Sequence, residues 1–343
     1  NLIIILFVSI SGSLNAQNVD EIIEKHLKAH GNADKWEAVE SMKITGRYTA
    51  FSIEEDFFAI KTKSGAYYSE LFLGQFKVFE GFNGESGWTI DPWQELDFPR
   101  ELNKAEINAF YQKAEFFSPF YKYKAKGSSV EYIGKEDLEG TEVHVLKLTR
   151  KNGSTETWYL NAKTYLEVKC ESGWVDFAYQ TTKETYFDDF RKVDGLIIPF
   201  YVEHTFGQRN RILQIENVEL NVEIDKSKFE LPQSEEIKKL AFLEGEWDVK
   251  VELMTRRGTW YNIDNTTSVI EFVKPNMLEE KMVYDRIFVQ SILAHYTYNS
   301  HSKKYRLAVY NGFSSNLEIA EGSFTDTTFT VDNLNIRFGY ETE

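Results

Sequence analysis

The residues best placed for chemistry are His26 and His30, which stand four positions apart in a segment of helical periodicity. On a helix this spacing puts both imidazoles on one face, as in many zinc sites. A zinc metalloprotease would need a glutamate directly after the first histidine, where this chain has Leu27. We therefore expect no metal site, and ordinary structural roles for both histidines.

Other reactive groups are also isolated from partners. The acidic neighbours 54–56 and 188–189 lie in strand-like segments, where adjacent side chains point to opposite faces and form no acid–base pair unless another strand completes one. The single cysteine, Cys170, cannot form an internal disulfide and is expected in the core. Phosphate loops, nucleophile elbows and dinucleotide fingerprints are absent from the sequence. We predict no catalytic residue, no cofactor and no enzymatic activity.

The prominent feature is aromatic content, with 26 Phe, 19 Tyr and 7 Trp in 343 residues. Such rings favour strands and provide large apolar walls. In a closed small barrel they would fill a core, whereas in a half-open barrel they would line a pocket for an alkyl chain. The sequence leaves both open. Our candidates for a cavity wall are Phe57, Tyr68, Phe72, Phe79, Trp88, Trp158 and Trp174, and further inward positions are Phe76, Tyr165 and Phe177.

Three helices and a long series of strands must position these rings. Helical periodicity begins near Asn18 or Asp20 and stops at Gly31, a second helix covers 33–39, and a third covers 101–111. Period-two segments separated by glycine turns, such as Asn152-Gly153, predict antiparallel strands. They cover 42–51, 56–63, 66–73, 76–81, 132–134, 141–150, 154–160, 166–171, 182–191, 198–206 and 211–221.

The length and composition predict two domains. The first closes at Leu231-Pro232 and covers 18–232, a linker covers 233–239, and a second unit covers 240–343. The second unit has strand-like runs at 247–255, 265–273, 277–283, 291–299 and 304–310. It ends in strand-like sequence, so we expect it to be incomplete at its C-terminus.

Charge and the first residues indicate the compartment. The formal net charge of −15 repels nucleic acid and favours solubility. The apolar run 2–10 precedes the small residues Leu14-Asn15-Ala16, which predicts a signal peptide over 1–16 whose basic n-region is missing, with cleavage after Ala16. We therefore expect an exported, periplasmic protein. No cysteine follows that site, so lipid anchoring is not expected.

Several segments of the first unit resemble the LolA-like family of periplasmic lipoprotein carriers. They are the opening helix with Gly31-Asn32-Ala33-Asp34-Lys35-Trp36, the hairpin Asn83-Gly84…Trp88…Pro92, the stretch 186–199, and the closing Phe229-Glu230-Leu231-Pro232. The resemblance implies a mainly β fold, an antiparallel half-barrel with helices covering an apolar cavity. It also implies binding of an acylated lipoprotein or lipid, with membrane-bound donor and acceptor proteins. Where the family often has a lid-holding arginine after the second strand, the matching stretch offers Tyr68 instead.

The second unit resembles a lipocalin-like, or calycin, antiparallel barrel. The resemblance rests on Gly245-Glu246-Trp247, in which the family's tryptophan plugs the barrel floor. The whole pattern favours a carrier that holds acyl chains, which could serve outer-membrane lipoprotein sorting. The alternatives are a two-barrel scaffold that binds other envelope proteins, or a binder of small apolar molecules without transfer activity.

Overall fold

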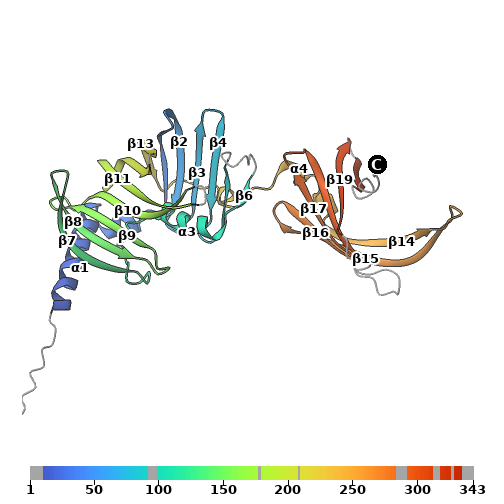
Figure 1. The fold of residues 1–343 in the computed structure, drawn as a ribbon, viewed down its shortest axis with the longest axis horizontal. Helices are drawn as coiled ribbons and strands as arrows, with labels where there is room; N and C mark the ends of the chain where they lie inside the picture. Colours follow the sequence, from blue (N-terminus) through green and yellow to red (C-terminus); the bar gives the residue numbers. More distant parts are fainter. Residues whose placement is uncertain are drawn as a thin grey trace, which may run out of the picture. The chain divides into compact units, whose positions relative to one another are not determined.

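The computed structural model describes residues 11–91, 99–176, 179–207, 209–282, 292–311, 317–325 and 328–333. The chain divides into two compact units, Asn1–Leu231 and Pro232–Glu343 (Figure 1). Of the expected signal peptide, residues 1–10 lie outside the described residues and 11–16 belong to a helix. Among the described residues, no helix combines the length and apolar character needed to cross a membrane.

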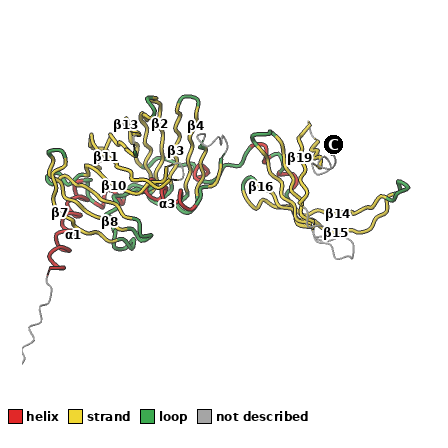
Figure 2. Tube along the Cα trace, viewed as in Figure 1, coloured by secondary structure: helices red, strands yellow, loops and turns green. Residues whose placement is uncertain are grey.

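The first unit is built on a single antiparallel sheet of thirteen strands, and Figure 2 shows how far strands outweigh helices. The mainly β, antiparallel half-barrel predicted from the sequence is confirmed. The strands are β1 Ser41–Ala50, β2 Ile53–Thr62, β3 Tyr67–Leu73, β4 Phe76–Phe82, β5 Gly87–Ile90, β6 Arg100–Glu101, β7 Ser129–Leu138, β8 Thr141–Thr149, β9 Thr155–Asn161, β10 Glu167–Asp176, β11 Tyr179–Val193, β12 Leu196–Phe206 and β13 Arg209–Leu220.

The order of the strands explains why one segment of the chain crosses the sheet. The sheet runs β6-β5-β4-β3-β2-β1-β13-β12-β11-β10-β9-β8-β7, so β6 and β7 follow one another in sequence but form opposite edges. The chain between them must pass from one edge to the other. This connection carries α3, Lys104–Lys113 (Figure 1). Helix α3 contacts both arms of the sheet, β4 through Lys113–Glu80 and β9 through Gln112–Glu156.

Each covering helix has a local reason to begin or end where it does. Helix α1, Ser11–Ala29, starts earlier than the expected 18–20, and residues 11–17 contain no proline that would break it. Helix α2 follows at Ala33–Glu37. Between them Gly31 has a φ of 107°, and a Cβ there would lie 2.4 Å from the carbonyl oxygen of Gly195. Only glycine allows the helix to end against the β11–β12 turn. Helix α3 begins with a capping box formed by Asn103 and Glu106.

Both faces of the sheet are packed, by different parts of the chain. Val19, Ile22 and Ile23 of α1 pack against strands β8 and β9. The outer face of β2–β5 is covered by the last segment of the unit, which includes η2, Lys226–Phe229, and the buried Phe229. The half-barrel is therefore closed by its terminal segments and by the β6–β7 connection.

The second unit is a seven-stranded antiparallel sheet in which strands follow one another in chain order. Its strands are β14 Gly245–Met254, β15 Trp260–Lys274, β16 Met277–Met282, β17 Ile292–Asn299, β18 Lys304–Asn311, β19 Leu317–Thr325 and β20 Thr328–Asn333.

Two local features of this unit differ from what we expected. Much of the expected linker 233–239 is helix α4, Glu235–Lys238, whose Ile237 is 1% exposed. Ile237 and Leu240 both pack into the core of the second unit. Trp247 is 43% exposed and donates to the Leu243 carbonyl at 2.7 Å, so it does not fill a barrel floor here. A calycin-like barrel remains a prediction.

Candidate ligand cavity

A cavity of about 450 Å³ lies on the inner face of the first unit's sheet. Its walls come from strands β1–β4 on one arm and β9–β13 on the other. Helix α1, helix α3 and the connection after α3, residues 114–128, cover it. We call α3 together with this connection the cover. The volume lies within the ~300–1,000 Å³ range of small-molecule sites.

Strand alternation decides which side chains reach the cavity. In β2 the wall residues are Phe57, Ala59 and Lys61, whereas Phe58 and Ile60 belong to the core on the outer face. In β3 the wall residues Tyr67, Ser69 and Leu71 alternate in the same way. The apolar part of the wall is continuous with the core formed around Ile44 and Ile198.

Two of the seven aromatic candidates line the cavity. Phe57 stacks on Tyr48, with ring centroids 6.2 Å apart. Trp158 stacks on Phe187 at 6.0 Å, and its indole N–H donates to Glu156 at 2.9 Å. These two residues come from opposite arms of the sheet, so the structure brings them to a shared space.

Four other candidates lie outside the cavity. Tyr68 and Trp88 are buried in the outer core with Phe229, and Phe79 packs against that core. Phe72 is 38% exposed, next to Phe79. The physical reason is that alternation groups residues by face without stating which face is concave, and one position of error reverses the assignment. They are corrected to the outer side of the sheet.

The remaining aromatic positions have other locations. Trp174 lies in β10 opposite Thr181, and its side chain is outside the described part. Phe177 is also outside the described residues. Tyr165 packs against the core beneath α1, and Phe76 packs near Ala50 and Leu71. Of these four positions, the two with described side chains, Tyr165 and Phe76, are not part of the cavity wall.

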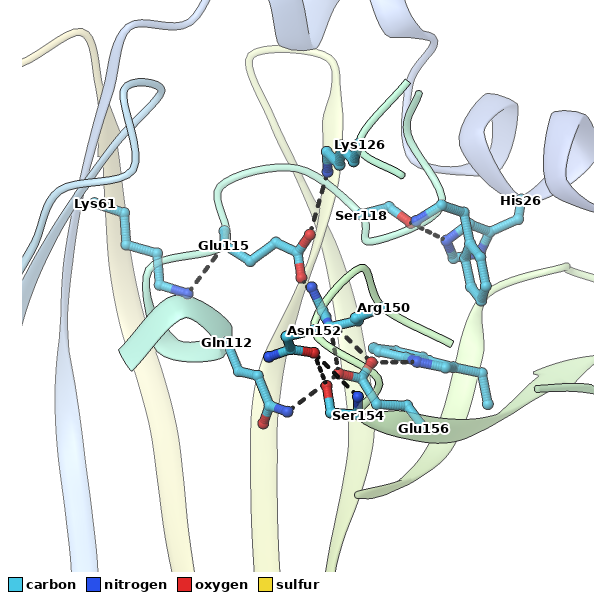
Figure 3. Close-up of polar contacts among 12 residues, drawn as sticks. His26, Lys61, Gln112, Glu115, Ser118, Lys126, Arg150, Asn152, Ser154 and Glu156 are labelled. Atoms are coloured by element: carbon cyan, nitrogen blue, oxygen red, sulfur yellow. Dashed lines mark hydrogen bonds and ion pairs between the residues drawn. The ribbon is translucent and has the colours of Figure 1, made fainter. Parts of the chain in front are cut away.

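A buried ionic network ties the cover to the sheet (Figure 3). Arg150 donates to Glu115 at 2.6 Å and to Glu156 at 2.6 Å, and Gln112 donates to Glu156 at 3.2 Å. Glu115 and Gln112 belong to the cover, whereas Glu156 belongs to β9. Although burial opposes it, both carboxylates raise the pKa of Arg150. Arg150 therefore stays charged and links three segments.

Lys61 makes a second link that the sequence had not indicated. Its ammonium group donates to the backbone carbonyl of Glu115 at 3.4 Å (Figure 3). Burial lowers the pKa of Lys61 to about 8. Tyr68, which we expected at the lid-holding position, points away from the cover, whereas Lys61 from the second strand reaches it. The cue in the sequence was a cation at an inward position of an apolar strand.

The two helix histidines form a third link. His30 bonds the carbonyl of Ile197 through Nδ1 at 2.8 Å and Glu167 through Nε2 at 2.7 Å. His26 bonds the Tyr165 carbonyl through Nδ1 and Ser118 through Nε2, at 2.8 and 2.9 Å (Figure 3). His26, His30 and Glu167 lie close enough to hold a cation. Each ring nitrogen already has a protein partner, so the arrangement works as a buried hydrogen-bond network.

This network fixes the protonation states. Burial would lower the pKa of His30, but the adjacent Glu167 outweighs it and raises that pKa. Burial would raise the pKa of Glu167, but His30 lowers it to about 2. His26 has no acidic hydrogen-bond partner, and burial lowers its pKa to about 4. The raised pKa of His30 and the lowered pKa of Glu167 therefore both favour the ionic form of this pair, while His26 is neutral at neutral pH.

Further polar groups lie on the wall between the arms. Lys113 binds Glu80 at 2.6 Å, and Ser69 donates to the same carboxylate at 3.1 Å. His204 shares a hydrogen bond with Thr185 at 2.9 Å. Cys170 also faces the cavity, and burial raises the pKa of its thiol, which keeps it protonated and weakly nucleophilic. Nothing here resembles an activated nucleophile with a base.

No family model matches the chain, and no curated protein does. Among solved structures, a DUF1329 family protein from Desulfovibrio piger is similar with a TM-score of 0.41 and 14% identity, covering 62% of this chain and 97% of that one. A putative outer membrane lipoprotein-sorting protein domain from Vibrio parahaemolyticus gives 0.42 and 13%, covering 63% and 97%. A LolA superfamily protein from Nitrosomonas europaea gives 0.41 and 13%, covering 61% and 96%. These similarities concern the fold alone.

Proposed function

We propose that this protein is an exported, non-enzymatic binding or carrier protein that holds an acyl chain of a lipid or lipoprotein in the cavity of its half-barrel. The observation that carries the proposal is the cavity of about 450 Å³, walled by Phe57, Trp158 and aliphatic side chains. A hydrocarbon chain needs such a wall and few polar contacts.

Burial of hydrocarbon supplies the affinity. Each methylene group removed from water contributes ~0.8 kcal/mol, so a single chain gains substantial binding free energy before its costs are subtracted. The half-barrel is formed around the cavity by a continuous sheet, which reduces the ordering cost of binding. A pocket of this size suits one chain or a molecule of similar bulk.

The cover supports reversible binding. Besides the buried aromatic side chains Phe116 and Phe120, polar links from Lys61 and Arg150 hold the segment after α3. Such links can exchange for water when the cover lifts, which exposes the cavity mouth for loading and release. We propose that loading and release take place in the periplasm, between membrane-bound donor and acceptor proteins. Lipoprotein sorting to the outer membrane is the process that such a carrier would serve.

The direct test is to purify the full chain from its native envelope and analyse bound lipid by mass spectrometry. We expect one acylated molecule per protein chain. A variant with Phe57→Asp, which places a charge on the wall, should be purified with much less lipid. The matched control is Phe72→Asp on the outer face, which should retain the lipid.

A folded wild-type chain that carries no lipid, and that binds no added fluorescent fatty acid, would contradict the proposal. That result would favour the scaffold function instead. Binding of small apolar dyes without any acyl chain would favour a small-molecule binder.

A further inference from the structure

The cavity wall is cationic although the whole chain is strongly acidic. Among the described residues that line it, the cations are Lys61, Lys113, Arg150, Lys183 and Arg211, and the carboxylates are Glu80, Glu115, Glu156 and Glu167. With His30 protonated, positive charges outnumber negative charges by two. The formal net charge of the chain is −15, so the inside of the half-barrel has the opposite sign to the protein as a whole.

The carboxylates on the wall are already bound to particular cations. Glu80 is bound by Lys113, Glu115 and Glu156 by Arg150, and Glu167 by His30. These pairs hold α3, the segment that follows α3, and α1 to the sheet. The excess positive charge therefore comes from the other cations on the wall, and Lys183 and Arg211 lie on neighbouring parts of it.

The strand register places both cations next to His204, on the two strands that flank it. Arg211 of β13 is directly opposite His204 of β12, and His204 is opposite Thr185 of β11. Lys183 is two positions from Thr185 and shares its face. Neighbours on adjacent strands lie within ~5–8 Å of one another, so His204 is close to both cations and lies between them. We call Lys183 and Arg211, with His204 between them, the cationic cluster.

The environment of the cationic cluster favours an incoming anion. Burial lowers the pKa of Lys183 to about 8, and Lys113 and Arg211 add to the effect. Burial, followed by the charges of Lys183, Lys113 and Arg211, lowers the pKa of His204 well below its ordinary value. Enclosed positive charge is costly, and a bound anion would lower the cost of keeping a wall with net positive charge ionised.

The same strands become apolar next to the cluster. Along β13 the inward residues are Arg211, then Leu213, then Ile215. Along β12 they pass from His204 to Val202. A molecule that lies along these strands would meet positive charge at one end and aliphatic wall at the other.

From this placement we infer that the ligand is a single-chain amphiphile with an anionic head group, a carboxylate or a phosphate, whose head lies at Lys183 and Arg211 while its hydrocarbon lies along Leu213, Val202 and Ile215. The inference rests on the proposed function, because it assigns the ligand class of the same cavity. Arg211 can donate two parallel hydrogen bonds to an oxyanion, and Lys183 adds a second charge.

The test compares palmitate, hexadecyl phosphate and hexadecanol, which share a chain and differ in the head group. Affinities are measured by displacement of a fluorescent fatty acid from the full chain at pH 7. We expect wild type to bind at least one anionic ligand about 10-fold or more tightly than hexadecanol. The variant Lys183→Met/Arg211→Met should lose this preference and still bind hexadecanol. The control Lys77→Met removes an exposed cation from β4 and should keep the preference.

The outcomes separate the two proposals. Equal binding of all three ligands by wild type would overturn the head-group inference and leave the acyl-chain function standing. No binding of any of them by folded protein would contradict the function itself. A comparison of the affinities for palmitate and hexadecyl phosphate shows which oxyanion the site prefers. Inorganic phosphate alone should bind weakly because it lacks the hydrocarbon chain.

A second measurement needs no variant. Palmitate labelled with carbon-13 at the carboxyl group is bound to wild type, and its chemical shift is followed from pH 8 to pH 5. We expect the bound carboxylate to stay ionised to lower pH than palmitate in neutral detergent micelles. A carboxyl group that titrates as it does in micelles would place the head group away from the cationic cluster and overturn the inference.

Discussion

At the scale of residues, the two faces of one strand have separate duties. Phe57 and Phe58 are neighbours in β2, yet Phe57 faces the cavity and Phe58 packs in the outer core. Effects of substitution should therefore divide by face: inward positions should change ligand affinity, and outward buried positions should change stability.

Phe57→Asp is expected to weaken binding of a fluorescent fatty acid at least about 10-fold, because a charge on the wall must be desolvated by the chain. The protein should remain folded, since Phe57 is half-buried beside an open space. Titration of the probe and circular dichroism measure the two effects. Unchanged affinity in a folded variant would remove Phe57 from the binding wall.

Trp88 provides the opposite case. It is 4% exposed, and its indole N–H donates to the Lys228 carbonyl on the outer side at 3.3 Å. Trp88→Ala should cost about 3–5 kcal/mol of unfolding free energy and leave the affinity of the folded fraction unchanged. Chemical denaturation measures the first quantity, and the fatty-acid titration, corrected for the folded fraction, measures the second.

The sequence predicted the kind of residue at the site better than its position. Aromatic walls were expected, and Phe57 and Trp158 are part of them. Tyr68 and Trp88 were misplaced because period two cannot tell the concave face from the convex one. Lys183 and Arg211 were missed because their proximity depends on the pairing of strands, which the sequence does not state.

At the scale of elements, α1 is attached to the sheet by groups that titrate. Below about pH 6.5 histidine is also protonated in the unfolded chain, so the stability that the protein gains from the raised pKa of His30 is fully present there. This stability is lost as the pH rises through the pKa that His30 has in the folded protein. The stability that the protein gains from the lowered pKa of Glu167 is present above about pH 4.5 and is lost as the pH falls to about 2. His26 is neutral in the fold, so stability falls as pH drops from about 6.5 to 4.

Glu167→Gln should therefore lower the melting temperature most near pH 6, where the ion pair is complete. Removing one partner of a buried pair costs about 3–5 kcal/mol. The fall in melting temperature of wild type between pH 7 and pH 9 should be smaller in the variant. Thermal melts across pH measure this, with the exposed Glu216→Gln as control. Parallel pH profiles for the variant and wild type would refute the assignment.

Elements with strong local signals were predicted well. The turn at Asn152-Gly153 joins β8 to β9, as expected for a glycine hairpin, and Asp194-Gly195 joins β11 to β12 in the same way. Short strands without such signals, β5 and β6, were missed, and β10 and β11 are longer than predicted. The α3 cover has a clear capping box, but its position over the cavity follows from the strand order.

At the scale of the whole molecule, all wall residues of the cavity come from the first unit. A chain that ends at Leu231 should therefore fold and bind a fluorescent fatty acid with the affinity of the full chain, within about twofold. Binding titration and thermal melting check this expectation. Loss of binding by a folded chain of this length would mean that the second unit takes part in the site.

The matched truncation ends at Leu220 and lacks the segment with Phe229. That segment covers Tyr68 and Trp88 on the outer face, so its loss should lower the melting temperature clearly. A chain that ends at Leu220 and melts like the longer one would contradict this role.

The pairing of the first strand with the last has a consequence for how the first unit folds. Met42 of β1 is paired with Leu220 of β13, and this pairing joins the two arms of the sheet. At a synthesis rate of ~5–20 residues per second, roughly ten to forty seconds pass between the synthesis of β1 and that of β13. During that time its edge is unpaired and open to other strands. Such long-range pairing slows folding. We therefore expect the nascent chain to need a chaperone that covers β1 until β13 has been synthesised.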